Sequence, residues 1–235
     1  MPLKDQVVVI TGGTGGLGQA VVRACLQAGA QVVTSHRGNL HQETFAAAFG
    51  PDANRLQLVA ADLTNEASVD ALAQTVLQQY SRLDGWLNLV GGYAGGTPVT
   101  DLSLADFEAM FTLNLRTAFL GSRAALRAML PRQRGSIVNV SSLGALRGTA
   151  GHAGYAASKA AVIRLTETMA AEAAPYGVRV NVVLPGMIDT PANRAAMPDA
   201  DRSTWVAPEA IAAVLVFLLS DAAQGVNGAS LPVGG

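Results

Sequence analysis

The chain has 235 residues, a formal net charge of −1, 50% hydrophobic residues and one cysteine. This length fits one large domain that buries roughly 70% of its unfolded surface without a disulfide or a metal. The near-neutral charge argues against nucleic-acid and anionic-membrane partners, because both favour a basic excess. The lone Cys25 fits a reducing compartment, and the apolar stretch Ala210–Leu219 is about half the ~20 residues of a membrane span. We therefore expect one cytoplasmic domain over residues 1–235 that spans no membrane.

Short apolar runs alternate with longer segments of helical pattern along the chain. The predicted strands are Gln6–Ile10, Gln31–Thr34, Arg55–Ala60, Gly85–Val90, Ser136–Val140, Val178–Leu184 and Ala229–Val233. The predicted helices are Leu17–Ala28, His41–Phe49, Glu66–Tyr80, Leu104–Leu130, Tyr155–Ala174 and Pro208–Leu219. Continuous apolar runs are typical of strands buried on both faces, and the alternation predicts a parallel sheet. We expect an α/β fold, a doubly wound parallel sheet of about seven strands with helices on both faces, which binds ligands beyond the carboxyl ends of its strands.

A glycine-rich loop joins the first strand to the first helix. Gly13, Gly15 and Gly18 satisfy the spacing G-x-G-x-x-G, and Gly12, Gly16 and Gly18 satisfy a second spacing, TGxxxGxG. Missing Cβ atoms allow a tight turn and a close approach to a pyrophosphate, which the positive end of the helix stabilises. The flanking strand and helix favour nucleotide binding over a purely structural turn.

The residues after the second and third strands indicate which dinucleotide fits. An acidic residue about 20 positions beyond the glycine loop would bind the ribose of NAD, but His36 and Arg37 stand there. Arg37 can offer a bidentate fork to a 2′-phosphate, so we predict NADP(H) rather than NAD(H); the alternative is a solvated arginine with His36 as a spectator. Asp62 follows the third strand and either binds an adenine amino group or holds the turn before the next helix.

Tyr155 and Lys159 are the strongest candidates for catalysis. A spacing of four places them on one helix face, and Lys159 is one of only two lysines beside fourteen arginines. A nearby ammonium favours the phenolate, so we expect a lowered pKa for Tyr155, which suits general acid–base chemistry. Ser142, or its neighbour Ser141, follows a strand and can bind a substrate carbonyl. Asn114, a poor helix-interior residue, either kinks its helix and holds a water near Lys159 or is a satisfied buried amide.

These motifs occur in the order found in the short-chain dehydrogenase/reductase family, which the chain resembles from residue 6 to its C-terminus. The resemblance rests on Thr11–Gly18, Asp62, Asn88 and Gly91, Asn114, Ser142, Tyr155 with Lys159, and Pro185-Gly186 followed by Thr190. It implies a Rossmann-type sheet and a catalytic tetrad of Asn114, Ser142, Tyr155 and Lys159. One departure is Leu89, which replaces the second Asn of the family's NNAG motif.

The resemblance also implies how the cofactor and a second subunit bind. Lys159 would hold the nicotinamide ribose, and Pro185–Thr190 would touch the nicotinamide. The expected contacts of the cofactor are Gly12, Thr14, Gly16, Leu17, Gly18, His36, Arg37, Asp62, Leu63, Gly91, Tyr155, Lys159, Pro185, Gly186, Ile188 and Thr190. A homodimer or homotetramer built on the helices Leu104–Leu130 and Tyr155–Ala174 is usual in the family. It agrees with a charged fraction of 14%, which is below the ~25% of typical soluble domains.

Two segments beside the expected substrate cleft resemble dihydropteridine reductases. They are Gly91–Gly96, which reads GGYAGG, and the stretch from Asp189 through Trp205. A glycine-rich lip and a tryptophan would suit a flat heteroaromatic substrate, although Trp205 can equally pack a lid against the core. The chain departs from that group in two ways. The dihydropteridine reductases resemble NADH users, with an acidic residue at the positions of His36 and Arg37, and they lack the serine that Ser142 supplies here.

The expected activity is hydride transfer between NAD(P)(H) and a carbonyl or hydroxyl carbon of a small substrate, with NADPH-dependent ketone or aldehyde reduction first. The alternatives are a pteridine reductase and a catalytically silent NAD(P)-binding scaffold or sensor. The intact set of Ser142, Tyr155 and Lys159 argues against the silent scaffold or sensor. We expect a short substrate lid at about residues 187–206 and no catalytic metal, because the three histidines lack metal-ligand spacing. One of them, His152, either lines the cleft or has no role.

Overall fold

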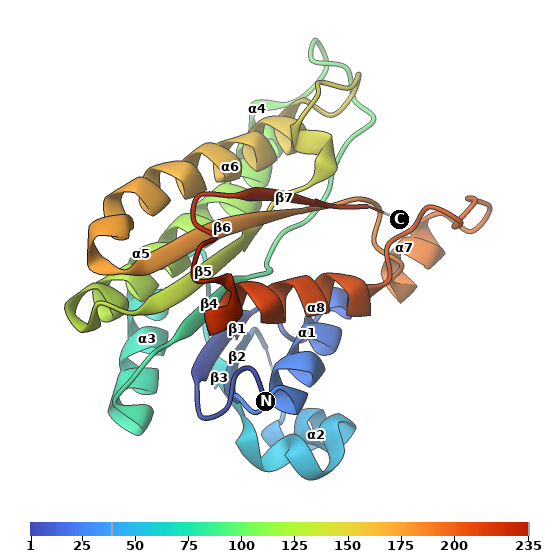
Figure 1. The fold of residues 1–235 in the computed structure, drawn as a ribbon. Coiled ribbons are helices and arrows are strands. Elements are labelled where there is room, and N and C mark those ends of the chain that lie inside the picture. The colour runs from blue at the N-terminus through green and yellow to red at the C-terminus, as the bar shows by residue number, and fades with distance from the viewer. Residues whose placement is uncertain (39, 235) are drawn as a thin grey trace.

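The computed structural model describes residues 1–38 and 40–234. Within these ranges the strands form one seven-stranded parallel sheet in the order β3-β2-β1-β4-β5-β6-β7 (Figure 1). The strands are β1 (Val7–Thr11), β2 (Gln31–His36), β3 (Leu56–Ala60), β4 (Gly85–Asn88), β5 (Gly135–Val140), β6 (Val178–Pro185) and β7 (Ser230–Val233). The predicted Rossmann-type α/β fold is confirmed. The order of the strands reverses between β1 and β4, and such a switch point opens a crevice at the carboxyl ends of the strands.

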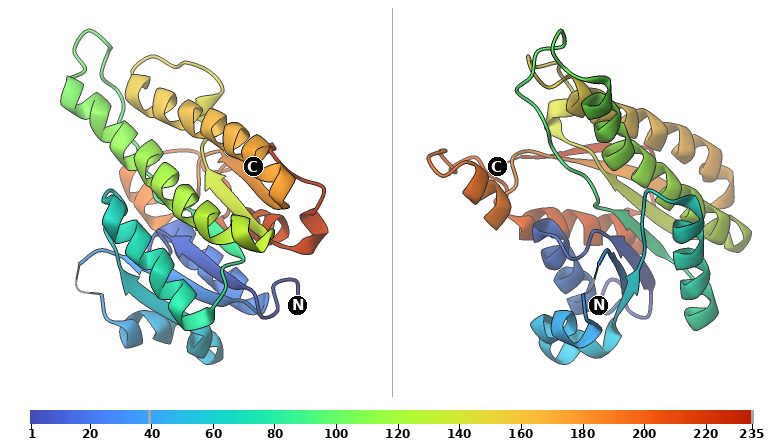
Figure 2. Two further views of the ribbon diagram at one scale, coloured as in Figure 1. Left: turned by 90° about the vertical axis from the view of Figure 1, so that its left-hand side faces the viewer. Right: turned by 180° about the vertical axis from the view of Figure 1, so that it is seen from behind.

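Helices cover both faces of this sheet, because its central strands, β1, β4, β5 and β6, are buried on both sides. On one face lie α1 (Gly16–Gln27), α2 (Gln42–Ala46) and α8 (Pro208–Leu219). On the other lie α3 (Glu66–Tyr80), α5 (Thr117–Met129) and α6 (Ala153–Ala173), which Figure 2 shows side by side in its left view. Each face has its own hydrophobic cluster, with Val22 and Leu215 in the first and Leu72 and Leu120 in the second.

Two helix starts follow the capping signals of the sequence. The side chain of Asn65 accepts a hydrogen bond from Ser68 N at 3.0 Å at the start of α3. Ser103 Oγ accepts one from Asp106 N at 3.0 Å at the start of α4 (Leu104–Met110). Such caps satisfy amide groups that the first turn leaves unpaired.

Three helical segments differ from the sequence-based expectation, and the predicted strand Gly85–Val90 ends at Asn88. The predicted helix Leu104–Leu130 is divided by a π-helical turn, Phe111–Arg116, between α4 and α5. The predicted helix His41–Phe49 is α-helical only over α2 and continues as a 3₁₀-helix to Arg55, where Gly50 has a φ of 58°. A short helix, α7 (Pro191–Ala196), begins inside the expected lid, with Thr190 as its cap.

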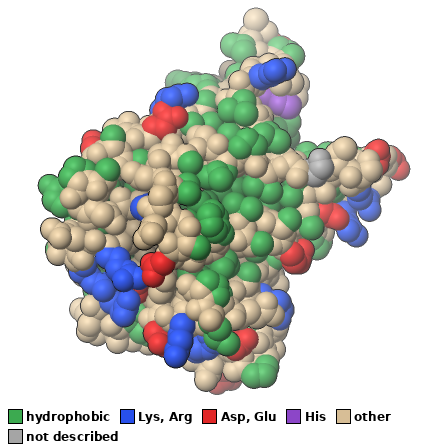
Figure 3. All heavy atoms as spheres, in the orientation of Figure 1, with side chains coloured by type: hydrophobic (Ala, Val, Ile, Leu, Met, Phe, Trp, Pro, Cys, Tyr) green, Lys and Arg blue, Asp and Glu red, His purple; other side chains and the backbone are tan. Residues whose placement is uncertain are grey.

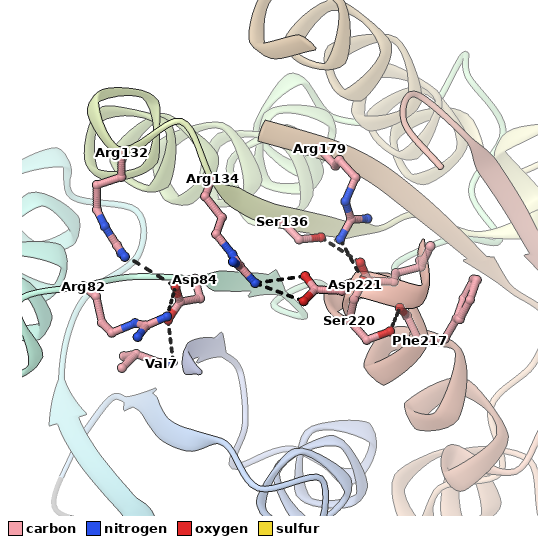
Figure 4. A network of polar contacts seen from close by, with 11 residues as sticks. Val7, Arg82, Asp84, Arg132, Arg134, Ser136, Arg179, Phe217, Ser220 and Asp221 are labelled. Carbon is pink, nitrogen blue, oxygen red and sulfur yellow. Dashed lines mark hydrogen bonds and ion pairs between the residues drawn. The ribbon is translucent and has the colours of Figure 1, made fainter. Parts of the chain in front are cut away.

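The amino ends of the strands are tied together by ion pairs (Figure 4). Asp84 is 3% exposed in its side chain and bonds Arg82 Nε at 2.7 Å and Val7 N at 2.9 Å. Arg134 reaches Asp221, at the end of α8, at 3.0 Å. These partners satisfy the carboxylate of Asp84 and pair Arg134 with Asp221. The glycine loop and the tyrosine–lysine pair lie toward the carboxyl ends.

In the part of the chain that the structure describes, the helices are too short or too polar to cross a bilayer.

Candidate active site

A cavity of about 360 Å³ opens at the carboxyl ends of β1, β2, β3 and β4. Its lining includes seven predicted cofactor contacts: Gly12, Thr14, His36, Arg37, Asp62, Leu63 and Gly91. It also includes Gly15 of the glycine motif and seven residues that were not predicted as cofactor contacts: Ser35, Ala61, Thr64, Leu89, Val90, Leu113 and Thr117. Leu113 and Thr117 are four residues apart, a spacing that places them on one helix face. Thr117 is also three residues after Asn114, so a helical projection through Asn114 would have found Thr117 but not its neighbour Leu113.

The glycine loop packs so closely that side chains would not fit. A Cβ on Gly18 would overlap the carbonyl oxygen of Gly12, and one on Gly13 would overlap Thr34 Oγ1. Gly12 has a φ of +76°, which favours glycine. The helix α1 then begins at Gly16 with no side-chain cap and no acidic residue in its first turn. Its positive end is therefore suited to an anion such as a pyrophosphate, so the loop fits the expected dinucleotide.

The residues that we expect to contact the adenosine part of the cofactor line the cavity at the ends of β2 and β3. Asp62 Oδ1 accepts hydrogen bonds from Thr64 N at 2.9 Å and Thr64 Oγ1 at 2.8 Å. These bonds lower the pKa of Asp62, and the charges of Arg37 and Arg116 add to the effect. Asp62 thus holds the turn before α3, which was the second of the two roles predicted for it, beside a contact with the adenine. Among the described residues, His36 Nδ1 is buried without a hydrogen-bond partner, and Arg37 is exposed beside it.

Lys159 is buried on α6, with its ammonium directed at the end of β5. Its Nζ donates to the carbonyl oxygen of Val140 at 3.0 Å. Burial lowers the pKa of Lys159 to about 8. A Cβ on Gly91 would lie 2.9 Å from Lys159 Nζ and 3.0 Å from Asn114 Oδ1, so both polar groups surround this glycine.

Asn114 occupies the π-helical turn and is 1% exposed. Its Oδ1 accepts from Gly92 N at 2.9 Å, and its Nδ2 donates to Ser158 Oγ at 3.0 Å. Ser158 Oγ in turn donates to the carbonyl oxygen of Tyr155 at 2.8 Å. Asn114 is therefore a buried, hydrogen-bonded amide, which was the second of its two interpretations, and it connects the loop after β4 to the helix of Tyr155. The π-helical turn interrupts the regular helix at its position.

Tyr155 and Ser142 lie on either side of Gly144. A Cβ on Gly144 would lie 3.5 Å from Ser142 Oγ and 3.7 Å from Tyr155 Cε1. Ser141 is excluded as the alternative, because its buried hydroxyl donates to the carbonyl oxygen of Lys159 at 2.7 Å. Ser142 is only partly buried, and its Oγ accepts from Gly144 N at 3.1 Å.

The expected lowering of the Tyr155 pKa is wrong for this structure. Burial raises the pKa of Tyr155; a hydrogen bond with Ser142 opposes this effect, and Tyr93 adds to it. The ammonium of Lys159 does not reverse the shift, since it is itself buried and bonded to Val140. Tyr155 is therefore a neutral phenol at pH 7, a form that donates a proton.

The segment that follows β6 reaches the glycine loop. A Cβ on Gly16 would lie 3.1 Å from Thr190 Cβ, so the start of α1 and the start of α7 are in contact. Pro185 ends β6, and Gly186 N donates to Val233 O at 2.9 Å. Ile188 forms a parallel bridge with Val206, so the two ends of the segment between them lie side by side. Of the predicted nicotinamide contacts, Thr190 thus touches the start of α1 beside Leu17, whereas Pro185, Gly186 and Ile188 lie on the segment that leads to it.

In residues 1–38 and 40–234, His, Cys, Asp and Glu side chains form no group of three that could hold a metal ion.

The sequence profile of the short chain dehydrogenases matches residues 6–201. The chain therefore belongs to the short-chain dehydrogenase family, and it is an NAD(P)-dependent oxidoreductase of alcohols and ketones. It is 35% identical to a levodione reductase of Leifsonia aquatica over 98% of this chain and 93% of that protein. It is 33% identical to a cyclopentanol dehydrogenase of Comamonas testosteroni over 99% of this chain and 97% of that protein.

Solved structures show the same likeness. The crystal structure of levodione reductase superposes with a TM-score of 0.90 at 32% identity, over 98% of this chain and 96% of that one. The structure of ElxO with NADP bound superposes with a TM-score of 0.92 at 25% identity, over 97% of both chains. That neighbour binds NADP, which agrees with a nicotinamide dinucleotide as the cofactor.

Proposed function

We propose that the chain is an NADPH-dependent reductase of small ketones or aldehydes. The observation that carries the proposal is geometric. Lys159 Nζ and Asn114 Oδ1 both lie beside Gly91, and the ring of Tyr155 and the hydroxyl of Ser142 both lie beside Gly144. General acid catalysis needs a proton donor and a hydrogen-bond donor near one carbonyl oxygen, and Tyr155 and Ser142 supply them.

The cofactor would lie along the carboxyl edge of the sheet. Gly12, Thr14, Gly16, Leu17 and Gly18 would hold its pyrophosphate at the start of α1. Asp62 and Leu63 would border the adenine, and Tyr155 and Lys159 would bind the nicotinamide ribose. When bound, the nicotinamide would supply the hydride that reduces the carbonyl carbon. Pro185, Gly186, Ile188, Thr190 and Gly91 would border the nicotinamide and exclude water from it.

Four side chains would take part in proton transfer to the substrate carbonyl oxygen. Ser142 would donate a hydrogen bond to the substrate carbonyl, and Tyr155 would transfer its proton to the same oxygen as negative charge develops there. The Lys159 ammonium would stabilise the phenolate that remains. Asn114 would hold the backbone beside Gly91 and Gly92 so that a water can return a proton to the site. We propose that residues 187–206, including α7, close over the substrate as a lid.

The proposed preference for NADPH over NADH rests on Arg37, the residue that follows β2. Arg37 is exposed at the mouth of the cavity, and its nearest acidic group of the site, Asp62, is already bonded to Thr64. Its guanidinium is therefore available to a 2′-phosphate. Equilibrium binding of NADPH and NADH to the wild-type protein tests this preference. Tighter binding of NADPH supports it, and tighter binding of NADH contradicts it.

A pteridine reductase is the second candidate, and the exposed ring of Tyr93 favours it. This ring lies 5.1 Å from that of Tyr155 in an edge-on arrangement, which offers a flat substrate an aromatic neighbour. Steady-state rates with a quinonoid dihydropterin and with simple ketones distinguish the two candidates. A rate specific to the pterin and far above the ketone rates would replace the first proposal.

We also propose a homodimer or homotetramer in the cytoplasm. Phe119 on α5 is 40% exposed and Leu104 on α4 is 70% exposed, so the face of these helices offers apolar surface to a second copy. Light scattering after size exclusion measures the mass directly, and a monomer at micromolar concentration would contradict the assembly.

A further inference from the structure

Two loops meet above Tyr155 and form the outer part of the site. One follows β4, and the other precedes α6; both rise at the top of the molecule (Figure 1). Gly96 N donates to the carbonyl oxygen of Gly151 at 2.9 Å. A Cβ on Gly151 would lie 3.1 Å from Gly96 Cα, and both glycines have positive φ, +97° and +78°. The loops are therefore joined through a contact that only glycine permits.

Tyr93 and His152 join the same two loops through their side chains. Tyr93 Oη and His152 Nε2 form a hydrogen bond of 2.9 Å. The Tyr93 ring also packs edge-on against two rings, at 5.4 Å from His152 and 5.1 Å from Tyr155. A Cβ on Gly95 would overlap Tyr93 Oη, so the glycine-rich segment makes room for this arrangement.

Tyr93 is nevertheless 60% exposed. An aromatic ring held by a hydrogen bond and two ring contacts, yet open to solvent, is pre-organised to meet a ligand at little entropic cost. Figure 3 shows hydrophobic, basic and histidine side chains gathered on this part of the surface. The ring adjoins Tyr155, so a ligand on it would lie next to the proposed proton donor.

We propose that Tyr93 and His152 form a specificity wall that selects planar cyclic carbonyl compounds over acyclic ones. This inference rests on the proposed function, because it assigns a substrate class to the same site. The Tyr93 ring would pack against the substrate ring while Tyr155 and Ser142 bond its carbonyl. The Tyr93 hydroxyl, fixed by His152, would meet a second polar group on the ring. An acyclic carbonyl compound lacks the flat surface that Tyr93 can cover.

Isothermal titration calorimetry tests the wall without depending on turnover. Isatin, a planar ring dicarbonyl, and diacetyl, an acyclic dicarbonyl, are titrated into protein saturated with NADP⁺. We expect Tyr93→Leu to weaken isatin binding about 3- to 10-fold, because it removes an aromatic contact, and to change diacetyl binding less than about 2-fold. Tyr93→Phe and His152→Gln should each weaken isatin about 2- to 5-fold, through loss of one hydrogen bond. Tyr176→Leu, at an exposed tyrosine before β6, is the matched control and should change neither.

The wall is refuted if wild-type protein binds isatin no better than diacetyl, or if Tyr93→Leu weakens both ligands equally. Turnover is measured separately with NADPH and NADH. If isatin binds through Tyr93 but neither dinucleotide reduces it, the wall stands and the carbonyl reductase proposal fails.

Discussion

The ammonium of Lys159 donates a hydrogen bond of 3.0 Å to the carbonyl oxygen of Val140, the last residue of β5. Lys159 is 6% exposed, and a carbonyl dipole compensates only part of the cost of burying a charge. This contact anchors α6 to the sheet at the point where Tyr155 must be placed. It also explains why burial, rather than a carboxylate partner, sets the pKa of Lys159 at about 8.

The buried lysine gives the stability of the cofactor-free protein a definite pH dependence. Its folded pKa of about 8 lies below the ordinary value of 10.5, so the unfolded state binds more protons above pH 8 and stability rises with pH. We expect this residue to add about 1 kcal/mol between pH 8 and pH 9. Above that range the raised pKa of Cys25 opposes the gain.

Urea denaturation of wild type and Lys159→Met at pH 7, 8 and 9 measures the effect. The difference between the two free energies of unfolding should change in favour of wild type as pH rises. A difference that is constant across the three pH values would show that Lys159 is not a buried cation with a depressed pKa.

We expect substitution of Asn114 to lower the catalytic rate as well as the stability of the fold. Asn114→Ala leaves Gly92 N–H without its acceptor and removes the bond to Ser158, which costs about 1–3 kcal/mol of stability. We expect kcat to fall about 100-fold, the lower end of general acid–base contributions, while the Kd of NADPH changes little. Asn54→Ala, at an exposed position of the 3₁₀-helix, is the control. A loss of stability with kcat intact would limit Asn114 to a structural role.

Arg37 should discriminate between the two dinucleotides. Arg37→Ala removes a charge-assisted contact to the 2′-phosphate, and such contacts are worth about 1.5–3 kcal/mol, so NADPH binding should weaken about 10- to 100-fold. NADH binding should not change. Arg164→Ala, at a side chain that is 79% exposed on α6, controls for the loss of one positive charge. Equal effects on both dinucleotides would place the 2′-phosphate elsewhere.

Gly18 should tolerate no side chain. Gly18→Ala places a methyl group on the carbonyl oxygen of Gly12, so the loop must move away from the start of α1. Overpacking of this kind costs about 1–3 kcal/mol, and we expect cofactor binding to weaken at least 10-fold. Gly225→Ala, which has open space around it, is the matched control. Dinucleotide titrations followed by protein fluorescence compare the two, and unchanged affinity in Gly18→Ala would contradict the close-packed loop.

Much of the fold was predictable because its signals are local. Most residues of the strands are apolar and occur in short runs, and the caps at Asn65 and Ser103 mark two helix starts. The glycine spacing, together with the strand before it and the helix after it, indicated a dinucleotide site at the edge where the cavity opens. Family resemblance added the remaining contacts, which no periodicity would have shown.

Other features depend on tertiary contacts and were not predictable from the sequence. The π-helical turn at Asn114 exists where its amide is bonded to Gly92 and Ser158, partners that are 22 and 44 residues away. The pKa of Tyr155 was predicted from the charge of Lys159, whereas burial of the phenol itself has the largest effect and raises it. The choice of Ser142 over Ser141 depends on which hydroxyl the fold directs at α6.

Tyr155→Phe tests the central claim most directly, because it removes one hydroxyl and preserves the ring. Protein saturated with NADPH is mixed with isatin, and the loss of reduced nicotinamide absorbance is followed in a single turnover, with the Kd of NADPH measured in parallel. We predict a rate at least about 100-fold below that of wild type, with the Kd changed less than about 3-fold. A wild-type rate in Tyr155→Phe, with NADPH bound normally, would contradict the assignment of Tyr155 as the proton donor.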